Sequence, residues 1–235
     1  MFLARSEVEQ LTKLLKTFFI LPYSTDLDGK DAEKLLRIIK GATGRLSRRK
    51  ELFDIIDGDI GYSVKTLNKT PKAVRVDLQE QRFCDVKELQ KLIATGTHSN
   101  ENQGKILLSY MRNRDMAQMK NVGVSEAKSL ILLKHWNSEK TEFEFKYWEE
   151  DFLGYIDELW NRNISGEIEW ISQAAGIHAR DRLRFDKKGK NVRLLRMHPK
   201  HNQIFTDHDI PADAVRISFS LKQIDWLELS RRLNI

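Results

Sequence analysis

One hairpin decides the fold: Leu52-Phe-Asp-Ile-Ile-Asp-Gly-Asp-Ile-Gly-Tyr-Ser-Val-Lys-Thr66. Its apolar and β-branched residues form two short runs, 52–56 and 61–66, with Asp57-Gly58-Asp59 between them. Asp-Gly between such runs predicts a hairpin, because glycine supplies the positive φ that a tight turn requires. Side chains alternate along a strand, so Ser63 and Lys65 share one face and Asp54 can reach that face from across the hairpin.

Length and composition limit the possible classes of protein. With 235 residues, 40% hydrophobic and 31% charged, the chain can bury one core, or one core and a small lobe. The single cysteine, Cys84, excludes an intramolecular disulfide and a cysteine-rich zinc site. No apolar run reaches the roughly 20 residues of a membrane helix. We therefore expect an intracellular protein with no membrane partner, and the net charge of +6 directs attention to where the basic residues lie.

Apolar periodicity predicts the remaining elements. Helices are expected over 2–19, 31–40, 86–94, 105–120, 152–161 and 221–233, and further strands over 73–78, 129–136, 141–148, 182–185, 191–197 and 214–221. Polar or basic loops are expected over 45–50, 67–72 and 96–104. This order predicts a mixed α/β (α+β) fold with a central mixed sheet flanked by helices. We expect a core at 1–165 and a basic, β-rich region at 166–235 that closes on the same core.

The hairpin offers an acid and a lysine for phosphodiester cleavage. That reaction requires an in-line water, a metal ion to activate it and a cation for the developing charge. Asp54 would bind Mg²⁺, which prefers carboxylate and water oxygens, and Lys65 would orient the water or stabilise the charge. The simpler alternative is a surface hairpin with a solvated acid and lysine. Its apolar neighbours argue against that alternative, because charges in a half-buried hairpin need a reason.

These residues also carry a family resemblance. Asp54 with Ser63-Val64-Lys65 resembles the core of the PD-(D/E)XK nuclease superfamily, and residues 61–66 are similar to a strand of certain type II restriction endonucleases. The resemblance implies a restriction-endonuclease-like core, Mg²⁺ as cofactor, double-stranded DNA as substrate, a homodimer and a prokaryotic cytoplasm. It assigns catalytic positions to Asp54, Ser63 and Lys65.

The chain departs from the family pattern at two positions. Phe53 stands where the family has proline, and Ser63 stands where it has a carboxylate. The missing metal ligand would then come from elsewhere, with Asp59, Asp57 and Glu33 as candidates.

Basic residues are concentrated beside the hairpin, in residues 45–50 and 69–75, and again in residues 180–200. We predict that both regions contact DNA. Arginine can grip phosphates or read guanine edges, and asparagine or glutamine can read adenine. The candidates are Arg48, Arg49, Lys69, Lys72, Arg75, Arg180, Arg182, Arg184, Lys187, Lys188, Lys190, Asn191, Arg193, Asn202 and Gln203. The polar loop 95–104 is either a further contact or a plain surface loop.

Other patterns are weaker. Glu142, Glu144 and Lys146 alternate on one face of a predicted strand and form a second candidate active site, although a solvated hairpin face explains them equally simply. The histidines His178, His198, His201 and His208 match no compact zinc spacing and are expected at the surface or on the DNA backbone. Two other functions stay open: a non-enzymatic nucleic-acid-binding protein, and a structure-specific repair nuclease.

Overall fold

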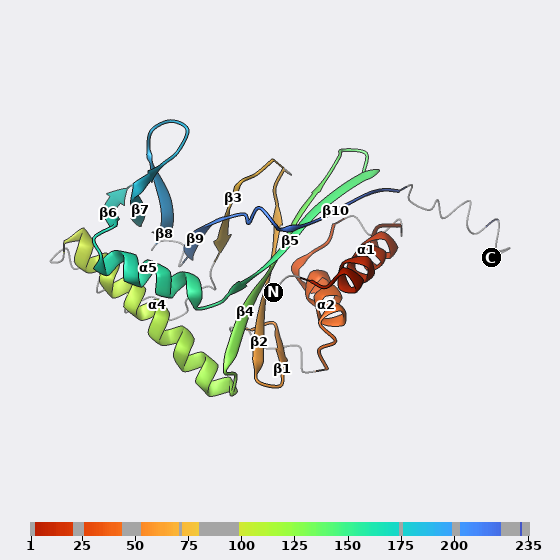
Figure 1. Cartoon of the computed structure of the whole chain (residues 1–235), viewed down its shortest axis with the longest axis horizontal. Coiled ribbons are helices and arrows are strands. Elements are labelled where there is room, and N and C mark those ends of the chain that lie inside the picture. The colour runs from red at the N-terminus through yellow and green to blue at the C-terminus, as the bar shows by residue number, and fades with distance from the viewer. Residues whose placement is uncertain are drawn as a thin grey trace. The chain divides into compact units, whose positions relative to one another are not determined.

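The computed structural model describes residues 3–20, 26–43, 53–70, 72–79, 99–173, 176–198, 203–221 and 231. Within these ranges the chain forms four helices and two five-stranded sheets (Figure 1), which confirms the predicted mixed α+β class. Two compact units interleave along the sequence: Met1–Ala73, Val124–Glu150 and Pro211–Ile235 form the first, and Val74–Gly123 and Asp151–Ile210 the second. We expected a boundary after residue 165, but that point lies inside the second unit.

The first unit contains the predicted hairpin in a mixed sheet. Its strand order is β1 (Ile55–Asp57), β2 (Ile60–Asn68), β4 (Glu126–Trp136), β5 (Glu142–Asp151) and β10 (Val215–Ser220). β1 and β2 are antiparallel, β2 and β4 are parallel, and β5 and β10 are antiparallel. The predicted hairpins within 52–66 and 129–148 are therefore confirmed, and β2 extends two residues into the stretch expected to be a loop.

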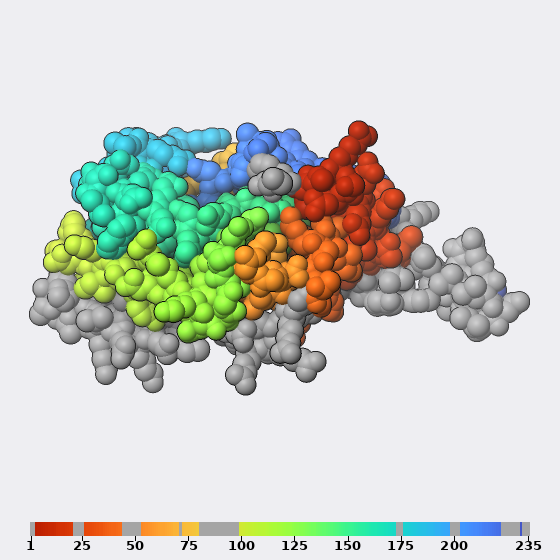
Figure 2. All heavy atoms as spheres, turned by 60° about the horizontal axis from the view of Figure 1, so that its bottom comes forward, coloured from red at the N-terminus to blue at the C-terminus, as the bar shows by residue number. Residues whose placement is uncertain are grey.

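Two N-terminal helices, α1 (Arg5–Ile20) and α2 (Gly29–Ile39), pack against one face of this sheet. In α1 the fully buried Leu11, Leu15 and Phe19 are spaced four apart, which places them on one stripe of the helix. Asp28 caps α2 by accepting a hydrogen bond from the Asp31 amide at 2.8 Å. Figure 2 shows these helices as adjacent red and orange surfaces.

The second unit contains an antiparallel sheet with the order β3 (Arg75–Gln79), β9 (Gln203–Asp209), β8 (Asn191–His198), β7 (Gly176–Phe185) and β6 (Ile168–Gln173). The helices α4 (Asn100–Val122) and α5 (Gly154–Ile164) share a core with β6 to β9. The predicted basic strands thus belong to β7 and β8, both longer than expected.

The loop predicted over residues 96–104 is wrong from Asn100 onward, because that residue begins α4. Ser99 caps the helix by accepting a hydrogen bond from the Asn102 amide at 3.3 Å. Gly104, which suggested a loop, lies in the helix where a Cβ would overlap the Trp170 ring. Tertiary packing, rather than turn formation, explains this glycine.

Several predictions lie outside the described residues: the helix 86–94, the loop 45–50 and almost all of the helix 221–233. Among the residues that are described, no helix has both the length and the apolar character needed to cross a membrane.

Candidate active site

The β1–β2 hairpin turns at Gly58, whose φ of 59° is the left-handed conformation that glycine adopts readily. The chain bends at Asp54, just before β1, and the Asp54 amide still donates to the Tyr62 carbonyl at 2.8 Å. The Asp54 carboxylate accepts a hydrogen bond from the Val64 amide at 2.6 Å. Since β1 pairs with β2 only at residues 60–62, this carboxylate occupies the edge of β2 that β1 leaves uncovered.

Phe53 anchors the chain immediately before this acid. Its side chain is buried, and its ring lies 2.7 Å from where a Cβ would stand at Gly61. Glycine at position 61 therefore allows the ring to rest on the backbone of β2. Phe53 stands where the resembled family has proline, and its packing against β2 fixes the position of the backbone just before Asp54.

Glu33 on α2 is the carboxylate that the fold brings to Asp54. Burial and the neighbouring Asp54 and Asp28 carboxylates raise the pKa of Glu33 from 4.5 to about 7, against the opposing effect of Lys30 and Lys34. Among the candidates for the missing carboxylate, Glu33 is thus the one that shares its surroundings with Asp54.

Lys65 is the cation of this group. Burial raises the pKa of Asp54, while the hydrogen bond from Val64 and the positive charge of Lys65 oppose that rise. Asp54, at the edge of β2, therefore interacts electrostatically both with Glu33 of α2 and with Lys65 of β2. The sequence indicated Asp54 and Lys65 as a pair, whereas Glu33 was one of several options.

Ser63 occupies the position of the expected acid and is only 3% exposed. In the parallel register it lies opposite Ser129 of β4, and Lys65 lies opposite Ile131. By strand alternation these side chains lie on the face of β2 opposite Tyr62 and Val64, which pack with the helices. A second hydroxyl therefore neighbours Ser63, and no carboxylate stands directly across from it in β4.

Asp59 and Asp57 lie at the turn end of the hairpin, away from Asp54. The Asp59 carboxylate accepts a hydrogen bond from the Ser125 hydroxyl at 3.0 Å, and its carbonyl accepts from the Ser125 amide at 2.8 Å. The Asp57 carboxylate accepts from the Thr43 amide at 3.1 Å. These bonds connect the turn to the start of β4 and to the segment after α2. Both acids therefore stabilise the conformation of the turn.

The donor set at Glu33 and Asp54 suits a hard cation. Mg²⁺ is commonly held by one or two carboxylates and retains several waters, so the carboxylates of Glu33 and Asp54 fit it. Within the described ranges, no group of three or more histidine, cysteine, aspartate or glutamate side chains has metal-binding geometry. Any metal here would therefore keep much of its water shell.

The second candidate site, on β5, is a sheet face. Phe143, Phe145 and Tyr147 are buried in the core, as the alternation predicts. The Glu142 carboxylate accepts a hydrogen bond from the Ser220 hydroxyl at 2.7 Å, and the Lys146 ammonium donates to the Ala73 carbonyl at 3.5 Å. Glu144 lies opposite Ser218 on β10. Strand pairing accounts for this group.

The expectation that the histidines lie at the surface is wrong for His178 and His208, which are buried in the second unit. The His208 ring stands 3.9 Å from that of Tyr155, and its Nε2 atom is 2.8 Å from the Thr206 hydroxyl. His201 and the side chain of His198 lie outside the described part of the chain.

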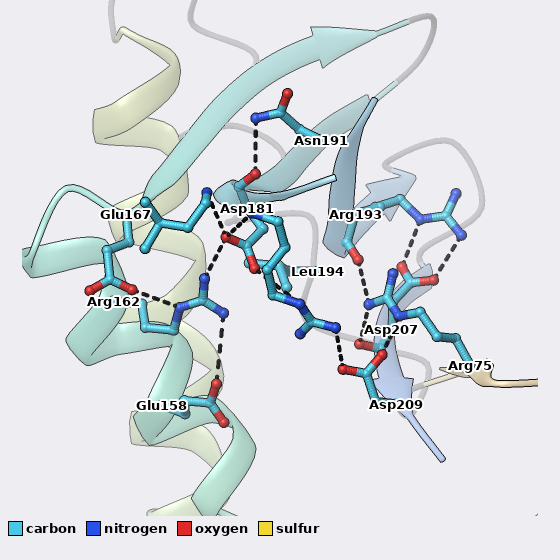
Figure 3. A network of polar contacts seen from close by, with 12 residues as sticks. Arg75, Glu158, Arg162, Glu167, Asp181, Asn191, Arg193, Leu194, Asp207 and Asp209 are labelled. Atoms are coloured by element: carbon cyan, nitrogen blue, oxygen red, sulfur yellow. Dashed lines mark hydrogen bonds and ion pairs between the residues drawn. The ribbon is translucent and has the colours of Figure 1, made fainter. Parts of the chain in front are cut away.

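Many of the arginines predicted to contact DNA are held in ion pairs within the second unit (Figure 3). Arg193 binds both oxygens of Asp207, at 2.6 and 2.9 Å. Arg75 and Arg184 pair with Asp209 at 2.7 and 2.6 Å. These acids are distant in sequence and reach the arginines only through strand pairing, so the sequence alone gave no signal of them.

Asp181 is the buried centre of the neighbouring part of this network. Its carboxylate pairs with Arg162 at 2.8 Å, and its carbonyl accepts a hydrogen bond from the Asn191 side chain at 2.9 Å. Arg162 also pairs with Glu167 at 3.1 Å. Arg182 donates to the Ile168 carbonyl at 3.2 Å.

The remaining predicted DNA contacts are distributed as follows. Arg180 is half-buried in β7, Gln203 begins β9, and Lys69 and Lys72 follow β2. Three exposed lysines form the β7–β8 turn: Lys187, Lys188 and Lys190. Arg48, Arg49 and Asn202 lie outside the described residues.

In comparisons with known proteins, no family model, no curated protein and no solved structure matches the chain.

Proposed function

We propose that the chain is a Mg²⁺-dependent endonuclease that hydrolyses phosphodiester bonds of double-stranded DNA, with Glu33, Asp54 and Lys65 in its active site. The supporting observation is that the Asp54 carboxylate, held at an uncovered edge of β2, interacts electrostatically with Glu33 of α2 and with Lys65 of β2. Like charges withdrawn from water destabilise a fold unless a cation joins them, so their proximity favours a binding site over a structural one.

In this proposal Mg²⁺ supplies Lewis-acid activation of a water molecule. Asp54 and Glu33 would hold the ion, and the hydrogen bond from Val64 keeps the Asp54 carboxylate oriented. The attacking water would give one proton to bulk solvent as its oxygen bonds to phosphorus, while the bond from phosphorus to the leaving sugar oxygen breaks and solvent protonates that oxygen. Lys65 balances the charge that develops on the phosphate oxygens.

Ser63 has a supporting role in the same proposal. A buried hydroxyl beside Ser129 can hold a water molecule in place but brings no negative charge. Strand β2 therefore lacks the carboxylate that the resembled family carries there, and we propose that Glu33 replaces it from the helix.

Sequence specificity and dimerisation are further parts of the proposal, supported by the resemblance of residues 61–66. Twofold DNA sites favour twofold proteins, and cutting both strands together requires two active sites. Discrete plasmid fragments and a dimeric mass in light scattering are the expected results. A smear, or cutting only at flaps or mismatches, would instead favour a structure-specific repair nuclease.

The decisive experiment is digestion of supercoiled plasmid with Mg²⁺ and, in parallel, with EDTA. Cleavage is expected only with the metal. Asp54→Asn and Lys65→Met should each reduce the cleavage rate by about 10³-fold or more, as expected when a charge that acts in the transition state is removed. Circular dichroism melting establishes that each variant is folded.

Asp59→Asn is the matched control, because Asp59 belongs to the same hairpin but bonds to Ser125. Cleavage by this variant should stay within about threefold of the original rate. If no divalent metal supports cleavage while DNA is still bound, the chain is a non-enzymatic DNA-binding protein. If both active-site variants still cut, the site lies elsewhere, and Glu142, Glu144 and Lys146 become the next residues to replace.

A further inference from the structure

The tip of the β7–β8 hairpin is a strongly basic segment of the surface. All nine residues from 182 to 190 are exposed, with the sequence Arg-Leu-Arg-Phe-Asp-Lys-Lys-Gly-Lys. Five cations and one acid give this segment a net charge of +4, compared with +6 for the whole chain. In Figure 1 the hairpin loop extends beyond the end of β6. The segment is called the hairpin tip below.

Two large apolar side chains lie open to solvent on the hairpin tip: Leu183 is 67% exposed and Phe185 is 61% exposed. Strand alternation places these two on one face and Arg182 and Arg184 on the other. The arginines are bonded back to the second unit, through the Ile168 carbonyl and Asp209. The apolar pair therefore faces away from those bonds, and an exposed pair of this kind commonly marks a contact surface.

The hairpin tip is also preformed. The Asp186 carboxylate accepts hydrogen bonds from the amides of Lys188 and Lys190, at 2.8 and 2.9 Å. These amide bonds lower the pKa of Asp186, so its carboxylate is ionised at neutral pH. Gly189, with a φ of 70°, completes the turn. A turn fixed in this way loses little conformational entropy when it binds a partner.

We propose that the hairpin tip enters the major groove of duplex DNA, with Leu183 and Phe185 against the base edges and Lys187, Lys188 and Lys190 on the phosphates. The proposal rests on the proposed function for its choice of DNA as partner. A two-stranded ribbon fits the major groove, which is about 12 Å wide, and is too broad for the minor groove of about 6 Å. Apolar side chains in the major groove contact thymine methyl groups.

Charge and size favour DNA over the other partners of an apolar, basic surface. Lysine is depleted from the cores of protein–protein interfaces, and here three lysines crowd one turn. Two apolar side chains provide little area for insertion into a lipid bilayer, but they are enough to contact base edges in a DNA groove. An anionic membrane is nevertheless a distinct outcome that the experiment separates.

The test measures binding of the full chain to a fluorescent pool of random-sequence 40-base-pair duplexes, in EDTA so that no cleavage occurs. The double variant Leu183→Ser/Phe185→Ser should bind roughly tenfold more weakly, because two apolar side chains no longer leave water. The double variant Met116→Ser/Ile164→Ser, at exposed apolar positions on α4 and α5, should bind as the original chain does.

The lysines are tested by the salt dependence of the same binding. Replacing Lys187, Lys188 and Lys190 with alanine should reduce the slope of log affinity against log salt by about 2 to 3, since each phosphate contact contributes about 0.9. Alanine at Lys13, Lys105 and Lys120, which are exposed on helices, should leave the slope unchanged. Methyl green, a major-groove ligand, should displace the protein, and netropsin, a minor-groove ligand, should not.

The hairpin proposal is overturned if the hairpin variants bind as the control variants do, if only netropsin competes, or if phosphatidylserine vesicles bind the chain while DNA does not. Its failure is distinguishable from failure of the proposed function. Asp54→Asn should retain full binding in EDTA while losing cleavage. A chain that never cleaves but binds through the hairpin tip would sink the nuclease proposal and leave the hairpin proposal standing.

Discussion

Glu33 and Asp54 in the first unit, and Asp181 and Asp207 in the second, are acids partly or wholly withdrawn from water. The second pair binds arginines, at 2.8 Å for Asp181 and at 2.6 Å for Asp207. In the first pair, the largest electrostatic influence on Glu33 is the like charge of Asp54. An acid matched by a cation stabilises its surroundings, whereas two neighbouring acids repel each other.

The pKa directions express this difference. Burial alone would raise the pKa of Asp181, but the hydrogen bond from Arg162 and the amides of Leu183 and Arg184 outweigh it and the pKa falls. Burial and the neighbouring acids together raise the pKa of Glu33 to about 7. The densely charged stretch 180–190 lies in the second unit, yet the acid with a pKa raised by neighbouring acids, Glu33, lies in the first.

The largest effect on stability is expected from replacing Asp181, the acid at the centre of the ion pairs in the second unit. Asp181→Ala should destabilise the protein by about 3–5 kcal/mol, because Arg162 loses its closest acidic partner and the network loses its fully buried acid. Urea unfolding followed by circular dichroism measures this loss. Asp213→Ala, at an exposed acid, should change stability by less than about 0.5 kcal/mol. A loss below about 1 kcal/mol for Asp181→Ala would show that the network is not structural.

The same acid gives a pH prediction with a definite sign. The folded-state pKa of Asp181 is lowered, so its contribution is complete above the unfolded value of about 3.9 and is lost as pH falls through the lowered value. The stability difference between the original chain and Asp181→Asn should therefore be constant from pH 5 to 7 and shrink below about pH 4. Urea midpoints at each pH test this, and a difference that stays constant down to pH 2 would contradict it.

A smaller effect is expected where packing positions the candidate site. Gly61→Ala should cost about 1–3 kcal/mol, because the added methyl group would meet the Phe53 ring, which must shift. Displacing Phe53 also displaces Asp54, so plasmid cleavage should fall more than stability does. Gly29→Ala is the control, since a Cβ there has its nearest neighbour at 4.0 Å. Equal cleavage by the two variants would show that Phe53 does not position Asp54.

The smallest effect has the opposite sign. Glu33→Gln should stabilise the protein by about 0.5 kcal/mol at pH 8, where it removes a like charge from a half-exposed site. A raised pKa means that the folded state holds the proton more firmly, so the destabilisation by Glu33 grows as pH rises from about 4.5 to 7. At pH 4 the variant and the original chain should unfold at the same urea concentration.

The substitution that stabilises the protein should also weaken its activity. Glu33→Gln should require about tenfold more Mg²⁺ for half-maximal cleavage, because one carboxylate ligand is lost. Glu9→Gln, on the exposed face of α1, is the matched control and should change neither property. A variant that is more stable and equally active would remove Glu33 from the site.

Local sequence signals predicted most of the elements and part of the site. The Asp-Gly turn, the helical period of residues 2–19 and the alternation along residues 141–148 each involve neighbours along the chain, and each of these elements is confirmed. The prediction of a loop through residue 104 failed because Gly104 makes room for the ring of Trp170, which is far away in sequence. The sequence alone does not distinguish a glycine that allows a turn from one that allows a side chain to approach the backbone closely.

The sequence by itself determined the hairpin, the helices around it and the candidacy of Asp54 and Lys65, because period and turn chemistry act over a few residues. Only the tertiary structure decided which charges meet. It brought Glu33 to Asp54 across α2 and β1, and it gave Arg193 its partner in Asp207 by pairing β8 with β9. Electrostatic interaction depends on distance through space, and the fold alone sets that distance.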